Sequence, residues 1–179
     1  MSTRNTVIRS LHDVGLAAWF GGALMGAVGL NGATPEVDDP TDRAKVASAG
    51  WARWAPVNAA AVGAHLLGGI GLILTNRQRL AVQSGARTNT LVKTALTGVA
   101  IASTAFSGWK GTQVFAAGKV HAEGGTTPSD RTPEAPAAAM RQLRIAQWVT
   151  PAVAAVLIVL GAQQGEQQRP GQLLPTLDS

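Results

Sequence analysis

Residues 54–76 read WAPVNAAAVGAHLLGGIGLILTN, and this run of 23 residues contains no Asp, Glu, Lys or Arg. A helix of about 20 apolar residues crosses the hydrocarbon core of a bilayer, which is about 30 Å thick. The run therefore predicts a membrane-spanning helix. Three other stretches have a similar length and character, at residues 14–35, 88–109 and 145–165, and Lys93 is the single charge within them.

The predicted fold is all-α, because backbone groups that meet no water in lipid must pair within a helix. We expect a four-span transmembrane helical bundle with a short amphipathic extracytoplasmic helix. The transmembrane domain covers residues 1–166, with spans at about 13–33, 55–76, 89–110 and 144–164. The polar residues 167–179 predict a disordered cytoplasmic tail.

Composition also favours a membrane protein over a soluble one. Charged residues make up 14% of the chain, against about 25% in an average soluble domain. The net charge is +5, but the basic residues flank the apolar runs and form no dense patch. We therefore expect contact with the lipid bilayer and no nucleic acid. The lack of cysteine excludes disulfides, thiolate metal sites and cysteine nucleophiles.

The loop between the second and third spans indicates the orientation. It carries four basic residues and no acidic one, namely Arg77, Arg79, Arg87 and Lys93. Short basic loops stay in the cytoplasm, so both termini are expected there, in the inner membrane of a bacterial cell. Tryptophans near the opposite surface then form either an aromatic belt or a site for a lipid or quinone head group: Trp51, Trp54, Trp109 and Trp148.

Local signals outside the spans predict three further features. The dipeptide Asp-Pro at 39–40 suits a helix start, so residues 40–54 are expected to form a short outer helix that joins the second span at Pro56. The Gly, Pro, Ser and Thr residues within 124–136 predict an exposed loop. Pro151 is expected to kink the fourth span.

Small residues recur at helical spacing in three of the spans. In lipid such stripes let helix backbones approach closely. In the third span they form a heptad-like seam with Thr, which either packs the bundle or borders a hydrated pathway. The residues are Ala18, Gly22 and Gly26 in the first span, Ala60, Ala64 and Gly68 in the second, and Thr90, Thr94, Thr97, Ile101, Thr104, Gly108 and Gly111 in the third.

His65 is the main candidate for chemistry, because an ionisable residue inside a span is costly and indicates function. It either bonds to a Thr or Ser of the third span or serves as a proton relay or a ligand for haem or copper. Asn58, seven residues earlier, shares its face. Met25 is a candidate second axial ligand of haem, and His12 with His65 a candidate metal pair. His121 is expected to be solvated.

The stretch Ala18-Trp19-Phe20-Gly21-Gly22, preceded by His12, resembles the opening helix of copper-resistance protein D-like and related small bacterial membrane families. Those families begin with a His followed by Trp-x-Gly-Gly, and the resemblance covers about one helix of four. It implies copper handling, for which His12, Met25 and His65 are the side chains present. The Cys-free composition rich in Ala, Gly and Arg also resembles membrane proteins of high-GC actinobacteria.

The sequence favours a protein that is not an enzyme. No span contains a paired carboxylate site, a Ser-His-Asp arrangement or a His-Glu-x-x-His motif. We expect a polytopic membrane protein that acts through a membrane-protein partner or as a homo-oligomer, such as an accessory subunit of an envelope or respiratory complex. The alternative is a small transporter, or a protein that binds haem, copper or quinone through His65. The sequence identifies no particular cofactor.

Overall fold

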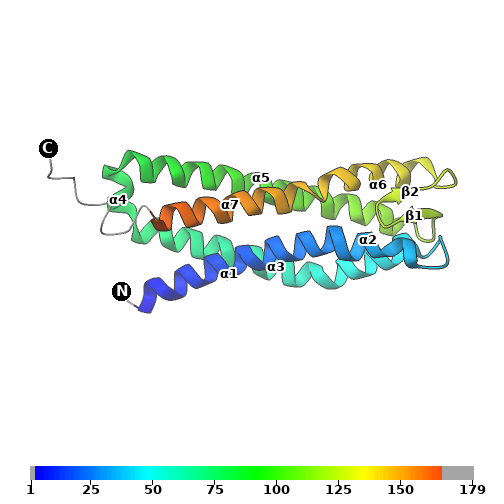
Figure 1. Cartoon of the computed structure of the whole chain (residues 1–179), viewed down its shortest axis with the longest axis horizontal. Coiled ribbons are helices and arrows are strands. Elements are labelled where there is room, and N and C mark those ends of the chain that lie inside the picture. The colour runs from blue at the N-terminus through cyan, green and yellow to red at the C-terminus, as the bar shows by residue number, and fades with distance from the viewer. Residues whose placement is uncertain (1–2, 167–179) are drawn as a thin grey trace.

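The computed structural model describes residues 3–166 of the chain. Within that range four helices are long and apolar enough to cross a membrane, at Asn5–Glu36, Arg43–Thr75, Ser84–Ala116 and Glu134–Gln163. Figure 1 shows these helices side by side along one long axis. The all-α fold class is confirmed, since 83% of the structure is helical. Four helices of this length and apolar character fit a multi-pass membrane protein.

Short elements extend or join the long helices. In chain order the elements are α1 (Thr3–Met25), the π-helical turn η1 (Gly26–Leu30), α2 (Asn31–Ala33), the 3-10 turn η2 (Thr34–Glu36), α3 (Arg43–Thr75), α4 (Arg77–Val82), α5 (Ser84–Ala116), the strands β1 (Ala122–Gly124) and β2 (Thr127–Pro128), α6 (Glu134–Ala146) and α7 (Val149–Glu166). The first span therefore continues from α1 to η2, and the fourth combines α6 and α7. The tail expected at 167–179 lies outside the described residues.

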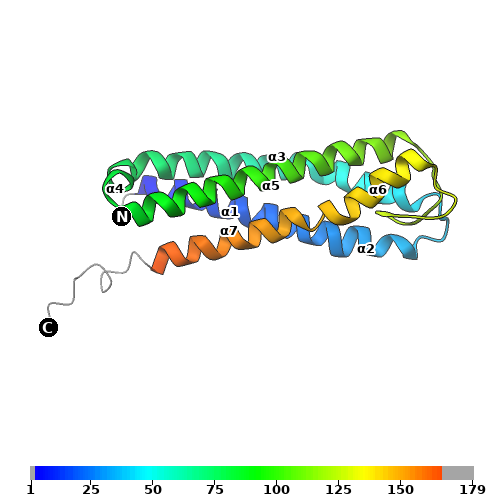
Figure 2. The same cartoon turned by 90° about the horizontal axis from the view of Figure 1, so that it is seen from above.

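The helices are longer than a bilayer requires. Both α3 and α5 contain 33 residues. At about 1.5 Å per residue each is about 50 Å long, against a hydrocarbon core of about 30 Å. In Figures 1 and 2 one end of the bundle carries α4 and the first turns of α1, and the other carries α2, α6 and the two strands. We call these the α4 end and the hairpin end.

The short outer helix expected at residues 40–54 is wrong. Residues from Arg43 onward are the first turns of α3, which continues through Pro56 without a break. A proline within a helix removes one hydrogen bond and crowds the preceding turn. Here Trp51 and Trp54, just before Pro56, pack onto glycines of α1, so α3 stays alongside α1 on both sides of the proline.

The kink expected at Pro151 is confirmed. Helix α6 ends at Ala146 and α7 begins at Val149, so the break lies at Gln147 and Trp148. A proline ring clashes with the carbonyl four residues earlier, and for Pro151 that residue is Gln147.

The exposed loop expected at residues 124–136 is also partly wrong, because its first residues fold onto the bundle. Strands β1 and β2 pair antiparallel, with Gly124 opposite Thr127. The N–H of Gly125 donates to the Thr34 hydroxyl at 2.6 Å. A Cβ on Gly125 would lie 2.8 Å from the Cβ of Ala47 in α3, so glycine is needed for this close approach.

The small residues of α1 and α3 form a packed face, with one correction. A Cβ on Gly22 would lie 2.0 Å from the ring of Trp54, and one on Gly26 would lie 2.1 Å from the ring of Trp51. Ala18 packs against the central core, and Ala64 is half-buried. Ala60, expected on this face, is exposed, and Ala61 is buried in its place. The face of α3 is turned by one residue because His65 and Gly68 meet α1.

The seam predicted on α5 packs only in part. The Thr104 hydroxyl accepts a hydrogen bond from another helix, and Thr97 is half-buried. Thr94 is exposed. A Cβ added at Gly108 or Gly111 would meet nothing within 4 Å, so the seam does not continue as a packed face beyond Thr104.

Buried side chains form two clusters along the bundle. The central cluster joins α1, α3, α5 and α7 through Leu16, Trp19, Ala61, Ala100, Ala154 and Leu157. The second lies at the hairpin end and contains Ala44, Val114, Val120, Ala122, Ala139 and Met140.

Candidate functional site

Two histidines from neighbouring helices lie against each other inside the bundle, with their rings tilted by 38°. The ring centroids of His12 in α1 and His65 in α3 are 4.2 Å apart. Two glycines allow this approach. A Cβ on Gly68 would lie 2.4 Å from the backbone nitrogen of His12, and one on Gly15 would lie 2.6 Å from that of His65. Any side chain at either glycine would push the two helices apart.

Hydrogen bonds determine which nitrogen of each ring carries its proton. His65 Nδ1 lies 3.1 Å from the backbone carbonyl oxygen of His12, which can only accept. His12 Nδ1 lies 2.9 Å from the carboxylate of Asp13. Both rings therefore carry a proton on Nδ1, and in the neutral form each Nε2 is left with a lone pair. Among residues 3–166 neither Nε2 atom has a hydrogen-bond partner.

The expectation that His65 bonds to a Thr or Ser of the third span is wrong, because its partner is the backbone of α1. Thr90 and Thr94 of α5 bond back to their own helix instead. The Thr90 hydroxyl donates to the carbonyl of Ala86, and the Thr94 hydroxyl donates to the carbonyl of Thr90, each at 2.9 Å. Hydroxyls bonded in this way need no partner from another helix.

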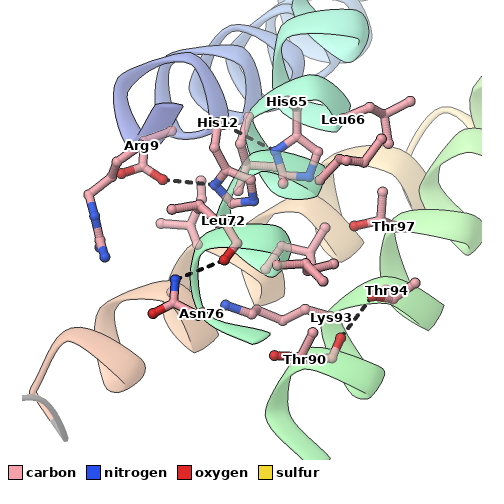
Figure 3. A pocket seen from close by; sticks show the side chains of 18 of the residues that line it. Arg9, His12, His65, Leu66, Leu72, Asn76, Thr90, Lys93, Thr94 and Thr97 are labelled. Atoms are coloured by element: carbon pink, nitrogen blue, oxygen red, sulfur yellow. Dashed lines mark hydrogen bonds and ion pairs between the residues drawn. The ribbon is translucent and has the colours of Figure 1, made fainter. Parts of the chain in front are cut away.

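The histidine pair lines a cavity of about 510 Å³ that is open on one side. The cavity lies towards the α4 end, between α1, α3, α5 and α7. Figure 3 shows Lys93 reaching into it from α5 and Asn76 from the end of α3. Charged and polar side chains thus share the cavity with an apolar wall made of Leu16, Leu66, Ile70, Ile73, Leu157 and Ile158.

His65 is almost completely enclosed, with 4% of its surface exposed. His12 and Lys93 are half-buried, whereas Asp13 and Arg9 are exposed at the mouth of the cavity. A cavity of this kind, largely apolar with a few convergent polar groups, is typical of small-molecule sites. It can hold the polar head of a ligand whose remainder is apolar.

Above the histidines, a hydrogen-bond network crosses the centre of the bundle. Trp19, which is fully buried, donates from Nε1 to the Thr104 hydroxyl at 3.1 Å. Thr104 lies 3.4 Å from the Thr150 hydroxyl, which donates to Ser103 at 3.1 Å. The network ties α1 to α5 and α7. The ring centroids of Trp19 and His65 are 6.1 Å apart, so the network lies close to the histidine pair.

A second network closes the bundle at the hairpin end. Asn31, which follows the π-helical turn, accepts a hydrogen bond from Trp51 Nε1 at 3.0 Å and donates to Gln147 at 2.8 Å. Its backbone carbonyl accepts from the Thr34 hydroxyl at 2.7 Å. One buried amide thus joins the first, second and fourth spans, which indicates a structural role for this end.

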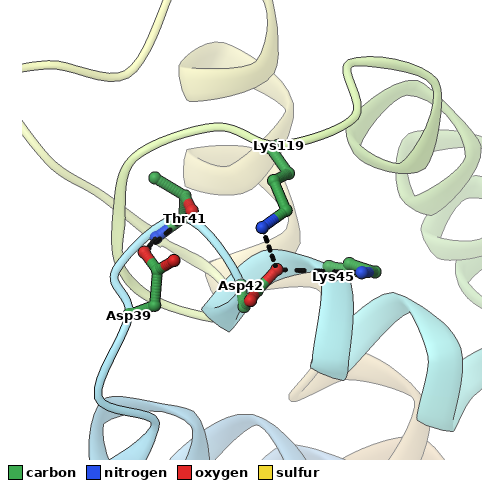
Figure 4. Close-up of polar contacts among 5 residues, drawn as sticks. All are labelled: Asp39, Thr41, Asp42, Lys45 and Lys119. Atoms are coloured by element: carbon green, nitrogen blue, oxygen red, sulfur yellow. Dashed lines mark hydrogen bonds and ion pairs between the residues drawn. The ribbon is translucent and has the colours of Figure 1, made fainter.

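Charged residues also gather on the outside of the hairpin end (Figure 4). The carboxylate of Asp42 pairs with Lys119 at 3.2 Å and with Lys45 at 3.8 Å. Asp39 accepts hydrogen bonds from the backbone N–H and the hydroxyl of Thr41, each at 2.8 Å. These two bonds, the backbone one first, hold the pKa of the Asp39 carboxyl below its ordinary value. Asp39 therefore closes a turn ahead of α3 and does not begin a helix.

The structure does not bring Met25 to His65. Met25 is exposed and lies one residue from Gly26, which packs against Trp51, fourteen residues before His65 on α3. At about 1.5 Å per residue this level is about 20 Å from His65 along the bundle, so the two cannot ligate one haem iron.

His12 and His65 cannot serve as the two axial ligands of one haem either. Axial imidazoles lie on opposite faces of the porphyrin, and two rings whose centroids are 4.2 Å apart leave no room for it. Within residues 3–166, no three His, Asp or Glu side chains come together as a metal site would require. The pair alone offers two nitrogen ligands. Asn58, expected on the His65 face, is not among the residues that line the cavity.

The remaining sequence-predicted residues lie elsewhere. Trp109 and Trp148 are exposed, as belt residues are, whereas Trp51 and Trp54 pack against α1. His121 is half-buried rather than fully solvated, and its Nδ1 is enclosed without a partner among the described residues.

Sequence reasoning did not assign Arg9, Asp13 or Lys93 to a site. The signal was the spacing of His12 and Trp19, which lie seven residues apart and so share a face of α1. That face is the one that meets His65. Comparisons of the chain with protein-family models, with curated proteins and with solved structures find no match.

Proposed function

We propose that this multi-pass membrane protein binds an amphipathic small molecule in the cavity between α1, α3, α5 and α7. The observation that carries the proposal is the pair of unpartnered Nε2 atoms of His12 and His65 on the wall of a 510 Å³ cavity. An imidazole nitrogen that faces a cavity takes its hydrogen-bond partner from a ligand or from water. Two such atoms on the same wall favour a bound ligand.

Binding explains this arrangement better than catalysis does. The carboxylate beside the pair, Asp13, is engaged with His12 and so orients the ring. The apolar wall around Ile70 and Leu157 suits a hydrocarbon portion, while Lys93 and the histidines suit a polar head. We propose the bacterial inner membrane as its location, with both termini in the cytoplasm, because the loop at the α4 end, which contains Arg77 and Arg87, is basic. The cavity would then open in the cytoplasmic half of the bilayer.

Native mass spectrometry of the protein extracted in a mild detergent tests the proposal. We expect one small molecule per chain to co-purify with the wild-type protein. The His65→Asn variant should lose it by about tenfold, since a net hydrogen bond contributes roughly this much to affinity. An Asn amide can still donate to the His12 carbonyl from the place of Nδ1, so the helices should remain packed while the Nε2 acceptor is removed.

The matched control is His121→Asn, which changes a histidine at the hairpin end, outside the cavity. The control should retain the molecule at the wild-type level. If no molecule co-purifies at fixed stoichiometry, or if both variants retain it equally, the proposal is wrong.

A second candidate function is that of a subunit in a larger membrane assembly, reached through α5. In the most apolar window of α5 6% of the residues are buried against the rest of the chain, compared with 28% in the first span. Gly98 and Gly108 face open space. The chain has no cysteine, so a single Gly98→Cys substitution allows disulfide cross-linking in membranes. A cross-linked homodimer or a defined partner would support the subunit function, and cross-links no more frequent than those of Ala60→Cys, an exposed control position on α3, would contradict it.

A further inference from the structure

The tautomers of the two histidines define what the head of the ligand must offer. Both Nδ1 protons are used, one by the backbone of α1 and one by Asp13. Both Nε2 atoms on the cavity wall are therefore acceptors, and a ligand satisfies them only by donating O–H or N–H hydrogens. A carbonyl, ether or phosphate diester oxygen would instead place its lone pairs against those of the imidazoles.

Lys93, on the facing helix α5, requires a hydrogen-bond acceptor on the ligand. Its ammonium lines the same cavity and can only donate, so an oxygen near it must accept (Figure 3). Arg9 and Asp13 are the other charged groups on the wall, and they stand at its mouth. A hydroxyl group meets both demands, because it donates through its hydrogen and accepts through its oxygen.

The two imidazole rings on the cavity wall favour a planar aromatic ring as the carrier of these hydroxyls. The imidazole centroids are 4.2 Å apart with the rings tilted by 38°, and both rings line the cavity. Gly69 leaves the edge of the His12 ring uncovered, since a Cβ there would lie 3.4 Å from it. The apolar residues Ile73 and Ile158 continue the wall, where a hydrocarbon tail can lie.

We propose, building on the proposed function, that the cavity is a quinol site. The head group is a para-dihydroxylated aromatic ring with an apolar tail. The reduced quinol binds more tightly than the oxidised quinone, because one quinol hydroxyl donates its hydrogen to His65 Nε2 and its oxygen accepts from Lys93. The quinone has no hydrogen to donate, so it leaves both Nε2 acceptors unpaired.

The experiment is a potentiometric titration of decylubiquinone in nanodiscs of phosphatidylcholine, with and without the protein, at one quinone per chain. Tighter binding of the quinol raises the two-electron midpoint potential of the bound pool. We expect a preference of at least about tenfold, which corresponds to a rise of about 30 mV over empty nanodiscs. His65→Asn should lose most of this rise because one acceptor is removed, whereas His121→Asn should keep it.

A potential that is unchanged or lowered by the protein would overturn the quinol inference. So would equal displacement of the quinol by dodecanol, because an aliphatic hydroxyl would then suffice. A phospholipid found as the co-purified molecule would also overturn it, while the proposed function would still stand. If no molecule co-purifies and no potential shift occurs, both the proposed function and the quinol inference fail.

Discussion

Glycines are common in both the α1–α3 pair and in α5, but they do different things in the two places. Between α1 and α3, Gly15, Gly22 and Gly68 each face a backbone or a tryptophan ring that a Cβ would strike at 2.6 Å or less. In α5, a Cβ added at Gly98 or Gly108 would meet nothing within 4 Å. The sequence spacing is similar, whereas the packing is opposite.

The difference is the residue that faces each glycine on the neighbouring helix. Trp54 of α3 fills the space beside Gly22, and Trp51 of α3 fills the space beside Gly26. The glycines of α5 have no such counterpart among the described residues. A small-residue stripe therefore predicts close packing only when the opposite helix supplies a matching backbone or ring.

The largest effect is expected from adding a Cβ at the tightest of the contacts with backbone. Gly68→Ala would place a Cβ 2.4 Å from the backbone nitrogen of His12, which no side-chain rotation can relieve. We expect the free energy of unfolding to fall by about 2–3 kcal/mol, as in other overpacked cores. Thermal unfolding in detergent, followed by tryptophan fluorescence, measures the change.

Gly108→Ala is the matched control in α5. It meets no neighbour, and alanine is the better helix former by up to about 1 kcal/mol, so stability should be unchanged or slightly raised. Equal losses in the two variants would show that α5 is packed as tightly as the α1–α3 pair, and the comparison would be wrong.

A smaller loss is expected where α1 reaches across to α5. Trp19→Phe removes the hydrogen bond to Thr104 and leaves space at a position with 0% exposure. Thr104 keeps its contact with Thr150, so the loss should be limited to about 1–2 kcal/mol. Trp109→Phe changes a ring that is 56% exposed and should alter stability by less than about 0.5 kcal/mol. The same thermal unfolding experiment measures both variants. A larger loss of stability for Trp109→Phe than for Trp19→Phe would mean that a partner covers α5.

Charge-free runs were enough to predict the four helices, because lipid allows few alternatives to an uninterrupted apolar helix. The same runs could not locate the helix ends. Outside the bilayer, backbone groups can bond to water, so a chain can form either a loop or a further helical turn there. The first turns of α3 were therefore mistaken for a separate helix. The hairpin was missed for a related reason. Gly125 is held by Thr34, ninety-one residues away, and no local pattern reports that bond.

For the candidate site too, the sequence predicted features within one helix but not contacts between helices. His65 could be singled out because any ionisable residue within a span is unusual. Its partner was assigned to the wrong helix, since periodicity specifies the face of one helix but not which neighbour it meets. Met25 is not a partner of His65. The sequence prediction assumed that residues near the middle of two spans lie at the same height in the bundle. The offset between α1 and α3 is set by contacts such as Gly26 on Trp51.

The smallest effect is expected outside both helix pairs, at the turn that leads into α3. Thr41→Val removes the hydroxyl that donates to Asp39 and keeps the backbone N–H, which is the larger cause of the lowered pKa. The pKa of Asp39 should therefore rise part of the way to its ordinary value, as measured by carbon NMR of its carboxyl group. A lowered pKa stabilises the fold above the unfolded-state pKa, and this stabilisation is lost as pH falls through the folded-state value. The variant should show that loss beginning at a slightly higher pH.

Thr112→Val, whose hydroxyl bonds only to its own helix, should leave the pKa of Asp39 unchanged. If Thr41→Val instead destabilised the protein as much as Gly68→Ala, the anchoring of α3 would lie in its polar turn and not in the glycines that it shares with α1.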